Sequence, residues 1–125
     1  MRCDPRNRDE QARVLQEALG TTRGSFSVYV IKLTSDVRDS PRRQCRWDDT
    51  SKPCVYVGQT SKSVEERFAD HLTGHNSRIS RYVDRLMPEL YEHYNPLDSR
   101  EQAEAVEQAL GCKLYWEGYT LLGGH

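Results

Sequence analysis

Arg67 and His71 form the first of three features in this sequence whose residue types and spacing suit chemistry on a phosphate group. A helix is predicted to begin at Val64, and on a helix residues four apart share one face. We expect that face to border a buried stripe of Val64, Phe68 and Leu72. A guanidinium can neutralise developing negative charge, and an imidazole can move a proton near neutral pH. The alternative is a solvated helix face that carries an ordinary arginine and histidine.

Glu107 is the second such residue, because it falls on the apolar stripe of the last long predicted helix, over 98–114. The stripe consists of Ala103, Leu110 and Leu114, whereas two neighbouring acids lie on the solvent side, Glu101 and Glu104. An unpaired buried carboxylate is costly, so Glu107 must be paired or bind a cation. Two interpretations stay open: an internal salt bridge, for instance to Arg67, and Mg²⁺ held by one carboxylate and several waters.

Tyr29 and Tyr56 are the third feature, since each lies between valines in a predicted strand. The strands are SFSVYVIKL over 25–33, apolar on both faces, and CVYVGQ over 54–59. A core tyrosine with a satisfied hydroxyl is the usual explanation for such a position. Nothing in the local sequence marks either tyrosine as catalytic.

Several further elements must position these side chains. Residues 9–19 have helical periodicity and end at Gly20, and Ser63 with Glu66 has the spacing of a capping box for a helix that ends at Gly74. A helix is expected over 78–87, before Pro88, and an edge strand over 88–96. The chain is expected to finish as a short strand or an extended tail over 119–125.

Arginines are concentrated in two parts of a chain whose formal net charge is only −1. Fourteen of the 18 basic residues are arginine, the side chain suited to bidentate contact with phosphate. A polar loop over 34–53 carries four of them, Arg38, Arg42, Arg43 and Arg46. The outer face of the predicted 78–87 helix carries three more, Arg78, Arg81 and Arg85.

Length and composition indicate one soluble domain, with residues 1–24 as a helical extension and 25–125 as the domain proper. No stretch approaches the roughly 20 apolar residues of a membrane helix, and the N-terminus lacks the apolar run of a secretory signal. The four cysteines form no C-x-x-C pair. We therefore expect reduced, structural thiols in a cytoplasmic protein.

Taken together, these residues stand in an order that resembles the GIY-YIG nuclease family from about Ser25 to about Leu114. SVY over 27–29 is similar to the GIY element, and YVG, ending at Gly58, is similar to the YIG element. Arg67, His71 and Glu107 match the family's arginine, histidine and metal-binding glutamate. The resemblance implies an α+β fold with a small three-stranded antiparallel sheet flanked by helices. To this the chain adds its N-terminal helix and the 34–53 insertion between the first two strands.

The resemblance also implies metal-dependent hydrolysis of a DNA phosphodiester. Glu107 would hold one divalent cation, Mg²⁺ or Mn²⁺, and Arg67 would stabilise the charge of the transition state. Tyr29 would be the general base, with Tyr56 or His71 as the alternative or as an orienting group. A tyrosine base needs its unperturbed pKa of about 10 lowered, and we expect the metal and Arg67 to lower it.

DNA contacts are expected from the arginines of the 34–53 loop and from Lys62, Arg78 and Arg81, with Arg85 extending the track. The family often places an asparagine after the glutamate helix, and this chain has none there. Either no residue takes the role of that asparagine, or His125 does. Specificity would come from the insertion and the N-terminal helix, or from a homodimer or a targeting partner protein. The alternatives are a catalytically silent DNA-binding module and a protein-interaction domain of the same fold.

Overall fold

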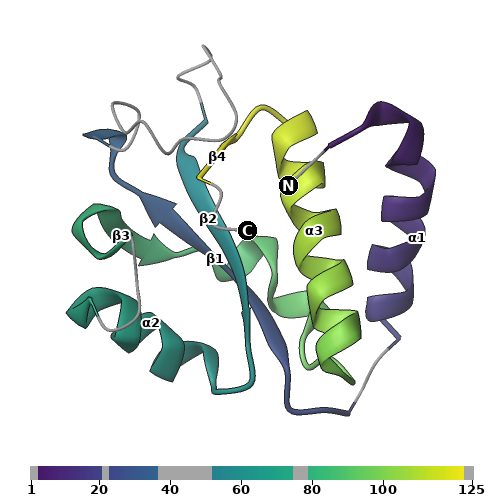
Figure 1. Cartoon of the computed structure of the whole chain (residues 1–125), viewed down its shortest axis with the longest axis horizontal. Coiled ribbons are helices and arrows are strands. Elements are labelled where there is room, and N and C mark those ends of the chain that lie inside the picture. Colours follow the sequence, from purple (N-terminus) through teal and green to yellow (C-terminus); the bar gives the residue numbers. More distant parts are fainter. Residues whose placement is uncertain (1–2, 21–22, 37–51, 75–78, 123–125) are drawn as a thin grey trace.

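The computed structural model describes residues 3–20, 23–36, 52–74 and 79–122, and places a twisted sheet between α2 on one side and the pair α3 and α1 on the other (Figure 1). In chain order the elements are α1 (Arg8–Ala18), β1 (Ser27–Leu33), β2 (Cys54–Thr60), α2 (Val64–Thr73), β3 (Val83–Leu86), α3 (Arg100–Trp116) and β4 (Thr120–Leu121). The α+β class expected from the sequence is confirmed. Within the described residues, no helix is long and apolar enough to cross a membrane.

The sheet has the order β3-β1-β2-β4 and is mixed. Strands β1 and β2 are antiparallel and in continuous register, from Ser27 opposite Thr60 to Leu33 opposite Cys54. Strand β4 is parallel to β2, and the backbone N–H of Leu122 extends this pairing by donating to the carbonyl of Val55 at 3.0 Å. The expected three-stranded antiparallel sheet is therefore wrong in detail, because the chain returns beside β2 after α3 and adds a fourth strand.

A helix was expected over 78–87, but the described residues of this segment form a 3-10 turn, Ser80–Tyr82, followed by β3. Strand β3 pairs antiparallel with β1, with Ile31 opposite Leu86. The backbone N–H of Thr34 donates to the carbonyl of Tyr82, and that of Met87 to the carbonyl of Val30. The apolar spacing suited a helix, but the open edge of β1 needs backbone hydrogen-bond partners and this segment supplies them.

The edge strand expected over 88–96 is also absent, and two 3-10 turns occupy Pro88–Leu90 and Glu92–Tyr94. Next to them the side chain of Asn95 takes the place of a strand residue. Its Nδ2 donates to the carbonyl of Val28 at 2.8 Å, and its Oδ1 accepts from the N–H of the same residue at 2.9 Å. This clamp satisfies the backbone of β1 immediately before Tyr29.

Helix α2 begins and ends where the sequence indicates. The Ser63 hydroxyl accepts from the N–H of Glu66, and Gly74 closes the helix with a left-handed φ of 82°. The expected buried stripe is wrong at one position, since Leu72 is 54% exposed whereas His71 is 1% exposed. Steps of four residues overshoot a full turn by about 40° each. The third member of the row, Leu72, has therefore turned to solvent, and His71 faces the core.

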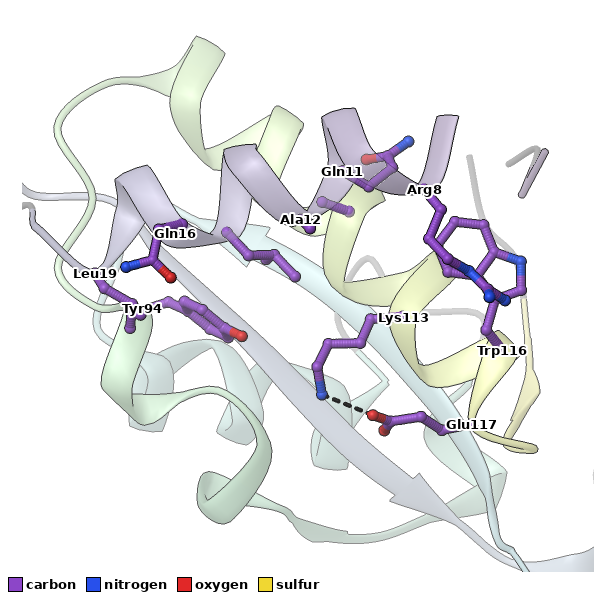
Figure 2. A pocket seen from close by; sticks show the side chains of 11 residues that line it. Arg8, Gln11, Ala12, Gln16, Leu19, Tyr94, Lys113, Trp116 and Glu117 are labelled. Atoms are coloured by element: carbon purple, nitrogen blue, oxygen red, sulfur yellow. Dashed lines mark hydrogen bonds and ion pairs between the residues drawn. The ribbon is translucent and has the colours of Figure 1, made fainter. Parts of the chain in front are cut away.

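Helix α1 packs on α3, and Leu15 and Ala18 are buried between them. A disulfide between Cys3 and Cys112 joins the start of the chain to α3, so the expected reduced state of these two cysteines is wrong. The contact between the helices leaves a groove of about 500 Å³, partly lined by Tyr94 (Figure 2). At one end of the groove an ion pair of 2.9 Å links Lys113 to Glu117.

Helix α3 begins at Arg100, one residue later than a cap at Asp98 would give. Ser99 is the N-cap, and its hydroxyl accepts from the N–H of Gln102 at 3.1 Å. The Gln102 side chain in turn accepts from the N–H of Asp98 at 2.6 Å. The predicted apolar stripe of this helix is confirmed, because Ala103, Leu110 and Leu114 are all buried.

Candidate active site

Tyr29 and His71 meet in the core between β1 and α2. The Tyr29 hydroxyl lies 2.9 Å from Nε2 of His71, and both side chains are 1% exposed. A hydrogen bond from the Arg67 guanidinium also reaches Tyr29. A guanidinium can only donate, so the tyrosine oxygen accepts from it. In the His71 tautomer whose Nε2 carries no hydrogen, the phenolic proton is donated to His71.

Gly58 makes room for this arrangement. It lies opposite Tyr29 in the β1–β2 register. A Cβ placed on Gly58 would lie 2.5 Å from the Tyr29 hydroxyl oxygen and 3.0 Å from a ring carbon of Tyr56. The glycine of the YVG motif is thus required by the close approach of two tyrosine rings to the backbone.

Tyr56 lies beside the same pair. Its ring centroid is 6.3 Å from that of Tyr29 and 5.4 Å from that of His71, the latter in an edge-on arrangement. Tyr56 is half-buried, whereas the Tyr29 ring is almost fully covered. The contacts place Tyr56 at the border between the buried pair and solvent.

Glu107 faces the same region from α3. An open pocket of about 610 Å³ is lined by Tyr29, Tyr56, Arg67 and Glu107, together with Gln59, Glu104 and Gln108. The four predicted residues that line it come from β1, β2, α2 and α3, and His71 lies directly behind Tyr29. The structure therefore brings all five predicted catalytic residues to one place.

Burial governs the electrostatics of the site. It raises the pKa of Glu107 to about 7, and the neighbouring Glu104 acts in the same direction. It also lowers the pKa of His71 to about 4, helped by the charge of Arg67 and opposed by Asp70. The imidazole is therefore neutral near pH 7, and Glu107 is a partly desolvated carboxyl group that titrates close to pH 7.

The protein groups around Tyr29 do not lower its pKa, whereas we expected Arg67 together with a bound metal to do so. Burial raises the pKa of Tyr29 well above its usual value, and Tyr56 and Glu107 add to the increase. Arg67 acts in the expected direction, through its charge and its hydrogen bond, but it is outweighed. With these protein groups alone, Tyr29 is a neutral phenol near pH 7.

A pocket of about 290 Å³ adjoins the first, and Gln59 and Arg67 line both. Lys62, predicted as a DNA contact, lines it, and its ammonium is 2.9 Å from a carboxylate oxygen of Asp70. The same oxygen is 3.7 Å from the Arg67 guanidinium. Asp70 therefore connects the predicted catalytic arginine to the predicted DNA-binding lysine.

The other predicted DNA contacts lie apart from these two pockets or outside the described residues. Arg81 is exposed over the ring of Tyr82, and Arg85 pairs with Glu89 at 3.6 Å on the surface of β3. Neither lines the pocket of Glu107 or its neighbour. The remaining predicted residues, the loop arginines Arg38, Arg42, Arg43 and Arg46 with Arg78 and His125, lie outside the described residues.

Sequence reasoning missed four residues that the structure places at the site or beside it: Asn95, Gln59, Asp70 and Arg100. The sequence could have pointed to Asp70, because it follows Arg67 by three residues and so shares its helix face. It could also have pointed to Gln59, which directly follows Gly58 of the YVG motif. Nothing in the local sequence pointed to Asn95 or Arg100, because only the tertiary fold brings them to β1 and to the second pocket.

A comparison with known families agrees with this geometry. A family model described as the GIY-YIG catalytic domain matches residues 46–111, which are 66 of the 125 residues. The matched range holds Tyr56, Arg67, His71 and Glu107 and begins after β1, so the place of Tyr29 rests on the structure. No curated protein and no solved structure matches the chain.

Proposed function

Because the chain belongs to the GIY-YIG nuclease family, we propose that it is a divalent-metal-dependent endonuclease that hydrolyses a DNA phosphodiester bond. The observation that carries the proposal is the convergence of Tyr29, Arg67 and Glu107 on one open pocket, with His71 bonded to the tyrosine behind it. A base, a fixed cation and a desolvated carboxylate are the groups that phosphodiester hydrolysis needs.

Tyr29 is the proposed general base, and His71 is proposed to accept the phenolic proton that Tyr29 must release. As a water attacks the phosphorus in line, the tyrosine oxygen takes the water's proton and its own proton moves 2.9 Å to Nε2 of His71. The transfer is concerted, because the resting pKa values keep Tyr29 protonated and His71 neutral. The negative charge of a bound phosphate favours the imidazolium and so assists the transfer.

Arg67 is the proposed electrostatic stabiliser. Its side chain is 21% exposed, lines the pocket and is held by Asp70 at 3.7 Å. A guanidinium fixed in a partly buried site stabilises the charge that develops on the phosphoryl oxygens without having to reorganise. Arg67 also polarises Tyr29, so one side chain serves both the base and the phosphate.

Glu107 is the proposed ligand for Mg²⁺ or Mn²⁺. The described residues hold no group of three or more His, Cys, Asp or Glu side chains that would enclose a metal. A carboxylate with a pKa raised by burial, beside a second carboxylate and two amides in an open pocket, fits a hard cation that keeps several of its waters. When bound, the cation supplies charge neutralisation at the scissile phosphate.

The proposed substrate is DNA, and targeting is proposed to depend on a homodimer or a partner protein, because the net charge of −1 favours weak non-specific binding. The Cys3–Cys112 disulfide is of a kind rare in the cytosol, so the cytoplasmic location stays a prediction that fractionation can test.

The test is cleavage of plasmid, nicked, branched and single-stranded DNA with Mg²⁺ or Mn²⁺, for the wild type and for Glu107→Gln. Glu101→Gln is the matched control, because Glu101 lies exposed on the same helix. We expect the wild type and the control to cleave at least one substrate and Glu107→Gln to cleave none. Retardation of DNA with no cleavage of any substrate would instead identify a silent binding module.

A binding measurement without DNA tests the metal site separately. Mg²⁺ or Mn²⁺ should raise the melting temperature of the wild type and of Glu101→Gln but not that of Glu107→Gln. In metal-free buffer at pH 8, Glu107→Gln should melt above the wild type, because it removes a desolvated charge. Equal metal stabilisation of all three proteins would place the cation elsewhere.

A further inference from the structure

The pocket that adjoins the Glu107 pocket carries a surplus of positive charge. Lys62, Arg67 and Arg100 line it, and Asp70 is the one carboxylate among its lining residues. The three cations come from the β2–α2 connection, from α2 and from the first residue of α3. Three separate elements thus direct basic side chains at a single recess of about 290 Å³.

Arg100 is the cation of this pocket that the resemblance did not lead us to expect. It is exposed, and its guanidinium lies 5.8 Å from the centre of the Phe26 ring, which limits its orientations. Within the described part of the chain it forms no ion pair with an acid. Its charge is therefore available to a ligand that enters the pocket.

Lys62 is engaged with Asp70, but that contact does not prevent it from binding a ligand. The ion pair spans 2.9 Å, and the lysine side chain is 53% exposed. A surface pair of this kind contributes at most about 1 kcal/mol, because water screens it. A phosphate offers stronger charge-assisted hydrogen bonds and can share the ammonium with Asp70.

We propose that Lys62 and Arg100 form a second phosphate subsite, which binds the phosphate next to the scissile one on the cleaved strand. The inference rests on the proposed function and extends it. Arg67 and Gln59 line both pockets, so a strand whose scissile phosphate contacts Arg67 reaches the second pocket with its neighbouring phosphate. The subsite fixes the register of the strand without reading bases, since phosphate contacts position the protein and carry no sequence information.

The test measures DNA affinity across a salt series in the Glu107→Gln background, which binds without cutting. Each phosphate contact contributes about 0.9 to the slope of log affinity against log salt, or about a 3.5-fold change in affinity between 50 and 200 mM. Lys62→Gln and Arg100→Gln should each reduce the slope by about 0.9, and their combination by about 1.8. Arg100→Lys should keep the slope, because it keeps the charge.

Arg13→Gln is the matched control, since Arg13 is exposed on α1 and lines neither pocket. In the cleavage-competent protein, Arg100→Gln should raise KM by a larger factor than it lowers kcat, whereas Arg67→Gln should act mainly by lowering kcat. A slope for Arg100→Gln equal to that of Arg13→Gln would overturn the subsite while wild-type cleavage leaves the proposed function standing. A wild type that neither binds nor cuts DNA would overturn both.

Discussion

The hydroxyl of Tyr29 and Nε2 of His71 lie 2.9 Å apart in the core, 42 residues apart in the sequence. The tyrosine comes from the central strand β1 and the histidine from the inward face of α2. A buried histidine could be a purely structural partner for a buried phenol. Here Arg67 also contacts the phenol, and Tyr29 lines the pocket of Glu107, which is why we propose that the pair transfers a proton.

We predict that Tyr29→Phe lowers kcat by about 10²–10⁴-fold, because it removes the proposed base. The ring and its packing are kept, so the loss should appear in kcat and not in folding. Tyr56→Phe is the comparison, as Tyr56 lines the same pocket and its ring lies edge-on to His71. Single-turnover cleavage rates measure both variants, and a larger loss for Tyr56→Phe would transfer the role of base to that residue.

The pKa of His71 predicts a loss of stability in acid. Its folded pKa of about 4 lies below the unfolded value of 6.5, so the unfolded chain binds more protons between these values. The contribution of His71 is therefore complete above about pH 6.5 and lost as the pH falls to about 4. Between pH 7 and 4.5 the loss should be about 2 kcal/mol.

Urea unfolding of the wild type and of His71→Gln at both pH values isolates this effect. The groups that face His71 are Tyr29, Tyr56, Arg67 and Asp70, and all of them are kept in the variant. The comparison is needed because Glu107, with its raised pKa, shifts stability in the opposite direction over the same range. A gap between the two proteins that is independent of pH would mean that His71 has an ordinary pKa.

We predict that Gly58→Ala destabilises the protein by about 1–3 kcal/mol, because the new methyl group meets the Tyr29 hydroxyl at 2.5 Å in a packed core. The displaced ring should also reduce cleavage. Gly20→Ala is the matched control, since its nearest contact would be an ordinary 3.5 Å. Equal melting temperatures for the two variants would show that the tyrosine ring can move aside at little cost.

We predict that Asn95→Ala costs about 2–4 kcal/mol, because it leaves both the N–H and the carbonyl of Val28 without their partner. Asn95→Asp should be intermediate, since a carboxylate can accept from the N–H but cannot donate to the carbonyl. Hydrogen exchange at the Val28 amide measures the loss of the clamp directly. Unchanged protection in Asn95→Ala would mean that other groups hold this part of β1.

Reduction of the Cys3–Cys112 disulfide should lower the free energy of unfolding by about 2–5 kcal/mol, because the bond joins residues that are 109 positions apart and so closes a long loop in the unfolded chain. The melting temperature of the oxidised wild type should fall on addition of a reductant. That of Cys3→Ser should start low and stay unchanged. Intact mass, which is lower by two hydrogens in the oxidised form, verifies the state of the bond.

The elements determined by local sequence were predicted well. The valines around Tyr29 and Tyr56 specify strands, and the capping residue Ser63 and the terminator Gly74 specify the ends of α2, because these preferences act over a few neighbouring residues. The order of Tyr29, Tyr56, Arg67, His71 and Glu107 was enough to indicate the family, and the family match confirms it.

Only the tertiary structure decided which other segments pack around these residues. The segment before Pro88 has helical spacing but forms β3, because the backbone of β1 required a partner along its edge. Arg100 and Lys62 are 38 positions apart and become neighbours only when α2 and α3 begin at the same recess. The sequence by itself determined which side chains could do the chemistry. Long-range strand pairing and burial decided the protonation states of these side chains and which residues surround them, because both depend on residues that are far apart in the sequence.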